Sequence, residues 1–385
     1  MRPRRFPSEP LRFTLDRNLN AAVSDRAQVC GHKLRAQAGA FLAAVICVLG
    51  GRAAAQEATE QQPSVADSLA NEIRAVFERT KKSVVRIEAV DDHGPLSGTG
   101  FFVDPAGTIY TSYTIGGESS DIVVCSGQGK LPARRLFADR RSGVAVLKVD
   151  ADTPFLSAGS SKALAIGSPV VAIGYPMDLP VSPNFGTVAG FDIKFSNRYF
   201  ATRHIRSNIP VQRGQGGAPV VNMRGEAVGI VIASIDGSNA CFTLPIEAAE
   251  KLRKDYIRFG ELRPGWMGVG IEPATSQVAG SIAEVIMLNV GSPGAKAGLR
   301  SGDVILHIND HSISSPEDVL DASFFIAAED EVKIEVARGE EKLEFRVIAG
   351  QKPATNARTA GDVPTFAPGT ADDLRGGPMR LDESR

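Results

Sequence analysis

Between residues 83 and 246 the sequence consists of short apolar runs separated by turns rich in Gly, Pro and Asp. Such runs, with many β-branched and aromatic residues, are typical of an all-β barrel or sandwich, and closing the sheets into two barrels removes exposed edges. We therefore predict a mostly β fold here. The expected strands are 83–90, 98–103, 108–115, 121–125, 131–137, 144–148, 169–174, 185–190, 204–207, a pair around Asn222 (up to 222 and 225–233) and 241–246.

Length and composition exclude several classes of protein. A chain of 385 residues has room for two or three domains, and 43% hydrophobic with 23% charged residues is typical of globular proteins. A net charge of −1 without a dense basic stripe argues against nucleic-acid binding. The four cysteines lack metal-ligand spacing, so we expect no metal or cofactor. For Cys125 and Cys241, a disulfide and two separate buried thiols both stay open, and the second is favoured.

The N-terminal region has the pattern of an export signal. Residues 1–37 are rich in arginine, 38–51 are apolar, and small residues follow up to Ala55. The apolar run is shorter than the ~20 residues that a membrane-spanning helix needs. We predict cleavage after Ala55, a true start near Val23 or Val29, and a periplasmic or secreted protein with no membrane span after cleavage.

The regions on either side of the β-rich part are less patterned. Residues 56–66 are polar and read as a linker, whereas 67–82 have helical spacing of apolar residues (Leu69, Ile73, Val76, Phe77). Residues 351–385 are rich in Pro, Gly, Ala, Thr and Asp and have almost no large apolar side chains. We expect this tail to be disordered, because it cannot bury enough surface to offset the entropy of ordering.

A glycine-rich turn at 214–217 precedes the strand around Asn222, and Gly214, Gly216 and Gly217 can bring backbone N–H groups close to a ligand. The chain resembles the protease domain of the HtrA (DegP-like) serine proteases over 80–257, and we assign 67–257 to this domain. The matching blocks, in order, are 97–104, 107–113, 145–148, 170–176 and 214–222. The resemblance implies a chymotrypsin-like double six-stranded β-barrel.

The family's catalytic triad is absent at the matching positions. The histidine, aspartate and serine positions hold Thr114, Gly143 and Gly216. Glycine has no side chain to attack a peptide bond, and threonine is no base near neutral pH. The chain is therefore interpreted as an inactive homologue, a pseudoprotease. Gly214, Gln215 and Gly216 remain as the oxyanion loop, either as a peptide-holding cleft beside Arg213 or as a purely structural turn, with Ala218 in place of a further glycine.

Other candidate catalytic side chains have no suitable spacing. We expect them to be ordinary solvated loop residues: His93, His204, His307, His311, Ser112 and Ser207.

Residues 258–350 form a second domain. Residues 265–271 and 291–309 resemble the carboxylate-binding loop and the Ser-Pro-x-x-x-Ala-Gly-Leu block of an HtrA-type PDZ domain. A groove helix is expected over 314–326, capped by Ser315, with strands at 332–337 and 343–348. The resemblance implies that a peptide adds a strand and places its carboxylate on this loop. The candidate binding residues are Trp266, Met267, Gly268, Val269, Gly270, Ile271, Val319 and Ala322.

Three functional hypotheses follow. The favoured one is an exported, inactive HtrA homologue that binds peptides or protein C-termini through its PDZ domain, as a scaffold or in envelope quality control. The alternatives are an active endopeptidase with a displaced catalytic set, and a structural envelope protein whose PDZ domain binds no C-terminus. For Trp266, packing on the linker or in the core and contact with a ligand both stay open. The family also implies a homotrimer, formed through the segment before Ser83.

Overall fold

The computed structural model describes residues 64–195, 198–235 and 240–353. The predicted signal region with Cys30 and Cys47, the predicted linker up to residue 63 and the predicted tail from residue 354 lie outside these ranges. Within these ranges no helix is both long and apolar enough to cross a membrane.

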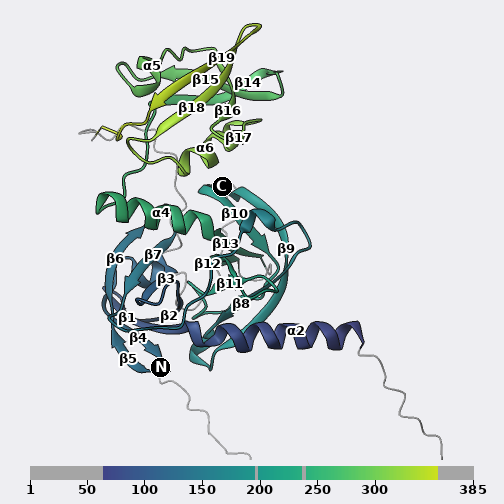
Figure 1. Ribbon diagram of the computed structural model, residues 1–385, viewed down its shortest axis with the longest axis vertical. Coiled ribbons are helices and arrows are strands. Elements are labelled where there is room, and N and C mark those ends of the chain that lie inside the picture. The colour runs from purple at the N-terminus through teal and green to yellow at the C-terminus, as the bar shows by residue number, and fades with distance from the viewer. Residues whose placement is uncertain (1–63, 196–197, 236–239, 354–385) are drawn as a thin grey trace, which may run out of the picture. The chain divides into compact units, whose positions relative to one another are not determined.

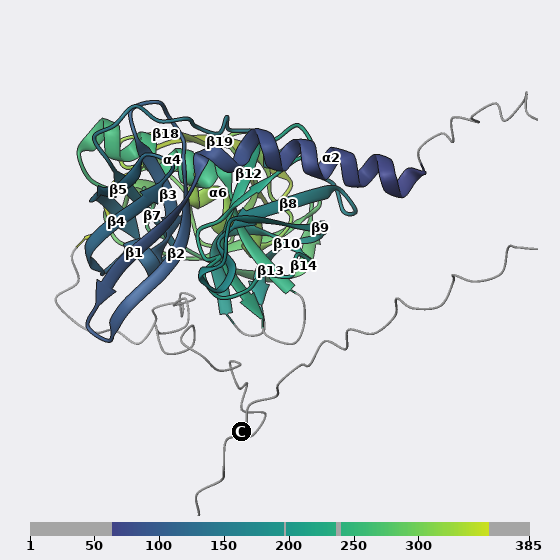
Figure 2. The same cartoon turned by 90° about the horizontal axis from the view of Figure 1, so that it is seen from below.

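The described chain begins with helix α2 (Val65–Thr80), where the spacing of apolar residues predicted a helix. Ser64 accepts a hydrogen bond from the backbone N–H of Asp67, whose carboxylate in turn accepts from the backbone of Ser64. This capping box fixes the start of the helix two residues before the predicted one. Figure 2 shows that α2 runs on beyond the strands, and its buried residues, Val76 and Thr80, lie at its C-terminal end.

The first β domain is a seven-stranded sheet in the order β5-β4-β1-β2-β3-β7-β6. The edge strands β5 and β6 are separated in the sequence only by Ala133, so the sheet must curl until its two edges nearly meet. Counting β5 and β6 as one bent strand gives the six strands predicted, although this sheet, unlike that of the second domain, is not closed into a barrel. The strands are β1 (Val84–Asp91), β2 (Gly94–Phe102), β3 (Thr108–Ser112), β4 (Ser120–Ser126), β5 (Gly129–Pro132), β6 (Arg134–Asp139) and β7 (Val144–Lys148).

Two predicted strands differ in this domain. The strand expected over 108–115 ends at Ser112, and residues Tyr113–Gly116 form a single helical turn, α3. Gly116 lies where a Cβ would be 3.0 Å from the side chains of Ala145 and Thr111, so the turn packs closely on β7 and β3. The strand expected over 131–137 is divided at Ala133, next to Pro132, which cannot donate a backbone hydrogen bond.

The second β domain is a closed six-stranded barrel in the order β10-β13-β12-β11-β8-β9, as expected for this fold class. Its strands are β8 (Pro169–Gly174), β9 (Ser182–Phe195), β10 (Arg198–Ser207), β11 (Pro219–Val221), β12 (Ala227–Ile235) and β13 (Ala240–Pro245). Short 3-10 turns at Ser161–Ala163 and Pro176–Asp178 connect these elements. Cys241 is buried in this barrel, whereas Cys125 in β4 is only half-buried. Both thiols are free, so the favoured alternative is confirmed except for the burial of Cys125.

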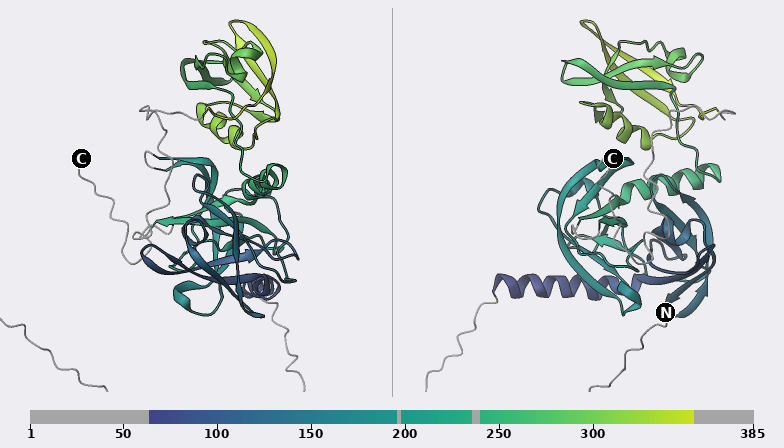
Figure 3. Two further views of the ribbon diagram at one scale, coloured as in Figure 1. Left: turned by 90° about the vertical axis from the view of Figure 1, so that its left-hand side faces the viewer. Right: turned by 180° about the vertical axis from the view of Figure 1, so that it is seen from behind.

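Helix α4 (Ile246–Phe259) joins the two β domains. Figures 1 and 3 show it lying across the ends of strands from both. Its Glu250 accepts a hydrogen bond of 2.5 Å from the buried hydroxyl of Tyr110 in β3, and Arg253 forms an ion pair of 2.8 Å with Asp104. Leu252 packs in a common core with Val146 of the first domain and Leu244 of the second. These contacts hold the two β domains as one body.

The third domain, which is the PDZ-like region predicted over 258–350, contains a sheet in the order β14-β15-β16-β18-β19, with β17 paired to β16. Helix α6 begins where Ser315 caps it, as predicted, with Pro316 at its first position and Asp318 completing a capping box. The elements are β14 (Val269–Val278), β15 (Ser281–Leu288), α5 (Pro293–Ala297), β16 (Val304–Ile308), β17 (His311–Ser312), α6 (Pro316–Phe324), β18 (Glu331–Arg338) and β19 (Glu341–Ile348).

His204 is a core residue of the barrel, which contradicts the expectation of a solvated loop histidine. Its side chain is stacked on Phe200 with ring centroids 4.2 Å apart, and its Nδ1 lies 2.8 Å from the carbonyl oxygen of Thr202. Burial lowers the pKa of His204 to about 4, although Thr202 and Asp321 act to raise it. The imidazole is therefore neutral in the folded protein at pH 7.

We predict that this histidine makes the protein less stable in mild acid. Because the pKa is lower in the folded chain than the ~6.5 of an unfolded one, its stabilising contribution is complete above about pH 6.5 and is lost as the pH falls toward 4. Between pH 7.5 and 5 this loss is roughly 2 kcal/mol. Urea unfolding followed by far-UV circular dichroism should show it, and His204→Phe should remove most of it. His93→Gln, at a side chain that is 54% exposed, should leave the loss unchanged; an equal effect of both variants would contradict the assignment.

Candidate functional site

The glycine-rich turn (residues 214–217) is enclosed between the two β domains. Thr99 donates its backbone N–H to the carbonyl of Gly216 at 3.0 Å and its hydroxyl to the carbonyl of Gly214 at 2.7 Å. Gly217 has φ +83°, and a Cβ there would lie 2.3 Å from the carbonyl oxygen of Thr99 and 2.6 Å from the backbone nitrogen of Ser112. Only glycine fits this position, because neighbouring backbone fills the space of a side chain.

Two of the three predicted triad positions meet at this turn. A Cβ on Gly216 would lie 3.2 Å from Ser112 Oγ and 3.9 Å from Thr114 Oγ1. The Ser112 and Thr114 hydroxyls are 2.9 Å apart and hydrogen-bond each other. Within the described chain, no histidine, carboxylate or lysine forms a hydrogen bond with either hydroxyl. The pair therefore lacks a base that could take a proton from it.

The third position, Gly143, supports the backbone but has no room for a carboxylate. Its carbonyl accepts a hydrogen bond of 2.6 Å from the N–H of Tyr113, next to Thr114. Gly143 has φ +75°, and a Cβ would lie 2.4 Å from Cγ2 of Ile232. Ile232 of β12 is 7% exposed and belongs to the core. An apolar side chain thus fills the space into which a side chain at 143 would extend, a feature that the sequence does not reveal.

Gln215 is fully buried beneath the turn. Its Oε1 accepts hydrogen bonds from the backbone N–H of Gln212 at 2.9 Å and from Asn184 Nδ2 at 3.1 Å. Its Nε2 has no hydrogen-bond partner among the described residues. Gln215 therefore holds the turn from inside rather than facing a ligand, whereas Arg213 on the turn is exposed.

The remaining candidate side chains lie away from this turn. His93 lies in the exposed turn between β1 and β2. Ser207 is buried in β10, as Ser112 is in β3, so the expectation that these two serines are solvated is wrong. His307 lies 3.4 Å from Glu335 and His311 stacks near Phe325, both in the third domain. No group of three or more His, Cys, Asp or Glu in the described ranges is arranged to hold a metal.

The loop at residues 266–268 of the third domain is held by its own backbone. Trp266 exchanges two backbone hydrogen bonds with Gly350, and the carbonyl of Met267 accepts from the N–H of Gly294 at 2.9 Å. Gly268 has φ +72°, and a Cβ there would lie 2.3 Å from the Cβ of Ser292. No carbonyl of the described chain accepts a backbone hydrogen bond from the N–H of Met267 or Gly268. Among the described backbone carbonyls, these two donors therefore have no acceptor.

The other predicted groove residues divide between core and surface. β14 is the first strand of its sheet, so one of its edges is unpaired within that sheet, and Val269, Gly270 and Ile271 lie on it half-buried. Val319 and Ala322 of α6 are buried in the core of the domain, together with the side chain of Met267. This arrangement leaves an open strand edge next to a loop with free N–H groups.

Helix α6 also contacts the second β domain. Arg203 of β10 forms an ion pair of 2.7 Å with Asp318, and Asp321 accepts hydrogen bonds from the Thr202 hydroxyl at 2.5 Å and the Arg203 backbone at 2.7 Å. Burial raises the pKa of Asp318, but hydrogen bonds from Ser314 and the charge of Arg203 outweigh it and leave the pKa below its usual value. The groove helix is therefore anchored to β10 by charge-assisted hydrogen bonds.

Comparison with known proteins agrees with this architecture. Residues 98–230 match the model of the trypsin-like peptidase domain, and residues 265–348 match that of the PDZ domain. The chain is 33% identical over 238 residues to a probable periplasmic serine endoprotease DegP-like of Rhizobium meliloti, covering 58% of this chain and 47% of that protein. For the corresponding protein of Halomonas elongata the identity is 28%, covering 70% of this chain and 60% of that protein. The chain thus spans about half to three fifths of the length of these relatives.

Solved structures show the same fold. The HtrA-type protease AlgW with a tripeptide has a TM-score of 0.63 at 20% identity, covering 74% of this chain and 99% of that one. The serine endoprotease from Yersinia pestis has a TM-score of 0.55 at 22% identity, covering 73% of this chain and 98% of that one. Fold and site define a trypsin-like peptidase domain followed by a PDZ domain. With this architecture the chain is similar to DegP-like periplasmic serine endoproteases, and its fold is that of HtrA-type proteases.

The geometry predicts unequal costs for restoring side chains at the triad positions. Gly216→Ser should change the free energy of unfolding by less than ~1 kcal/mol, because the one tight contact of its Cβ, 3.2 Å to Ser112 Oγ, is with a hydroxyl that can rotate away. Gly143→Asp should cost roughly 2–4 kcal/mol, because it combines φ +75° with a clash against Ile232. Chemical denaturation measures both, and Ile232→Ala in the Gly143→Asp background should recover part of the second loss. Equal costs for the two single variants would contradict the description of the site.

Proposed function

We propose that this protein is an HtrA homologue without proteolytic activity that binds peptides or protein C-termini through its PDZ domain. The single observation that carries the first part is the absence of a side chain at Gly216. Peptide hydrolysis by this fold needs a nucleophile at that place, a base beside it and a group that orients the base. Thr114 supplies no base near neutral pH, and Ile232 lies where a side chain at Gly143 would extend.

The second part rests on the third domain. A free strand edge at Val269–Ile271 can pair with an extended peptide, and the N–H groups of Met267 and Gly268 can receive its terminal carboxylate. Both features survive in a chain that lacks the catalytic groups, so binding is the activity that its residues support best. We infer a scaffold or quality-control role, in which the protein holds exposed protein segments.

The location and assembly belong to the same proposal. The relatives are named as periplasmic, and the N-terminal 55 residues have the pattern of a cleavable export signal, so we infer an envelope location. A homotrimer through the segment before Ser83 stays a prediction, which light scattering of the purified protein would test.

The alternative is an active endopeptidase, and the names of the relatives favour it. We predict that the purified chain leaves reduced, unfolded casein intact over a day, as followed by mass spectrometry. Thr114→His with Gly216→Ser should remain inactive, because Gly143 supplies no carboxylate to orient the new histidine. Cleavage that copurifies with the protein through successive columns and is lost in a single-residue variant would establish the alternative.

Peptide binding is tested separately at the PDZ loop. A random peptide library with free C-termini should yield ligands, and amidation of the terminal carboxylate should weaken them at least tenfold, as measured by fluorescence polarisation. Gly268→Ala should abolish binding, because its Cβ would lie 2.3 Å from Ser292. Gly291→Ala is the matched control, with φ +71° and no atom within 4 Å of the new Cβ. If no peptide binds, or if amidation has no effect, the structural hypothesis replaces this one.

A further inference from the structure

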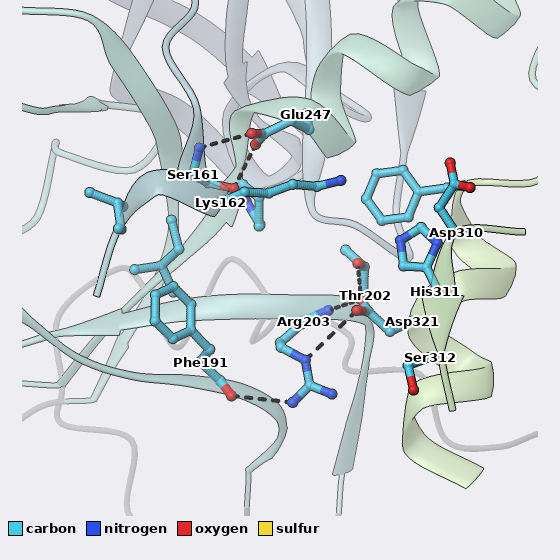
Figure 4. A pocket seen from close by; sticks show the side chains of 14 residues that line it. Ser161, Lys162, Phe191, Thr202, Arg203, Glu247, Asp310, His311, Ser312 and Asp321 are labelled. Atoms are coloured by element: carbon cyan, nitrogen blue, oxygen red, sulfur yellow. Dashed lines mark hydrogen bonds and ion pairs between the residues drawn. The ribbon is translucent and has the colours of Figure 1, made fainter. Parts of the chain in front are cut away.

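A pocket lies between the second β domain and the PDZ domain, apart from both the glycine-rich turn and the PDZ loop. It encloses about 570 Å³, within the ~300–1,000 Å³ typical of sites for small ligands. Figure 4 shows its two walls. One wall comes from β9, β10 and the turn at 161–164, and the other from residues 310–312 and helix α6. The two walls are joined by the hydrogen bonds that Asp321 accepts from the Thr202 hydroxyl and from the backbone N–H of Arg203.

Most of the polar groups of the pocket are already paired. Glu247 accepts hydrogen bonds from the Ser160 hydroxyl at 3.1 Å and from the backbone and hydroxyl of Ser161 at 2.8 and 2.6 Å. Asp321 is held by β10, and Arg203 by Asp318 and Asp321. These side chains already have hydrogen-bond or ion-pair partners within the protein, so they do not require a ligand to supply one.

Two charged groups of opposite sign are left. Lys162 on the barrel wall and Asp310 on the PDZ wall are both exposed, and no hydrogen bond or ion pair joins either of them to another side chain of the described residues. In Figure 4 the Lys162 side chain extends across the hollow toward the PDZ wall. The two groups do not reach each other, since no ion pair within 4.0 Å joins them. A ligand that carries both a carboxylate and an ammonium group would pair with both.

The rest of the lining is apolar. Leu164 and Phe191 on one side and Phe325 on the other are half-buried, so part of each ring or chain still faces the hollow. Burying such surface against an apolar ligand side chain stabilises a complex by about 25 cal/mol per Å². The lining therefore favours a molecule with charged ends and an apolar body.

We propose that this pocket binds a short zwitterionic peptide, of dipeptide size, with apolar side chains. Its carboxylate pairs with Lys162, its amino group pairs with Asp310, and its side chains pack on Phe191 and Phe325. Because the walls belong to two domains, the ligand also strengthens the contact between them. The inference is independent of the proposed function, since neither the triad positions nor the PDZ loop takes part.

The test is titration calorimetry of the full chain with Leu-Phe, its N-acetylated form and its amide. Lys162→Met should weaken Leu-Phe roughly tenfold but leave the amide, which lacks the carboxylate, unchanged. Asp310→Asn should weaken Leu-Phe but leave the acetylated form unchanged. Lys254→Met is the matched control, a lysine of α4 that is exposed and lies outside the pocket. Free phenylalanine in the same assay distinguishes an amino acid from a peptide as the preferred ligand.

Two results would overturn the proposal. One is that the wild-type protein shows no binding of Leu-Phe up to about 5 mM, because a Kd above that concentration would be too weak for a functional site. The other is binding that Lys162→Met and Asp310→Asn leave unchanged but Gly268→Ala abolishes, since it would place the dipeptide on the PDZ loop. Binding that survives Gly268→Ala and depends on both charged residues supports the proposal, whether or not the PDZ groove binds C-termini.

Discussion

The two β domains meet where the backbone of Gly217 passes between them without room for a side chain. A Cβ there would lie within 2.6 Å of Thr99 O, Thr111 Oγ1 and Ser112 N. Hydrogen bonds from the backbone and hydroxyl of Thr99 then attach the turn to the first domain on both sides of Gln215. The glycine-rich turn is therefore needed for the joint between the domains, independently of catalysis. This constraint requires glycine at position 217 whatever residue stands at position 216.

The sequence predicted the fold well, because the strands alternate in the way that half-buried strands require and the turns carry Gly, Pro and Asp. It also placed Thr114 and Gly216, which the structure brings close to Ser112. It did not predict the helical turn at 113–116, since the residues of that turn have strand-like composition and their conformation is decided by packing of Gly116 on β7. The burial of His204 was not predicted either, because it too is decided by packing, here against Phe200.

Features that depend on contacts between distant segments could not be predicted from the sequence. Ile232 is separated from Gly143 by almost ninety residues (232 − 143), and only the fold shows that its methyl group fills the space beside that glycine. The pocket between the domains combines residues from 161 to 325, none of which forms a motif. By contrast, the groove helix could be placed from the Ser315-Pro316 capping pattern, because capping is a local interaction.

Helix α6 has two faces with different tasks. Val319 and Ala322 face the core of the PDZ domain beside the predicted peptide groove, while Asp318 and Asp321 attach the helix to β10. A ligand that moves the helix in the groove must also alter the contact with the barrel, because one rigid element takes part in both. The charge-assisted hydrogen bonds of Arg203 and Thr202 therefore resist such movement, and the cost of breaking them enters the affinity of any ligand that requires it.

Under the proposed function, the absence of a carboxylate at position 143 is linked to the packing of Ile232. A triad needs a buried carboxylate, which destabilises a fold unless it is fully hydrogen-bonded. With glycine there, Ile232 packs into the space and is 7% exposed, and burying such a side chain contributes roughly 2–3 kcal/mol. Return to a working triad would require new residues at 114, 143 and 216 and a smaller one at 232, and the step at 143 loses stability before any activity appears. Under the proposed binding function that step brings no benefit, and the arrangement with Ile232 packed against Gly143 is the more stable one.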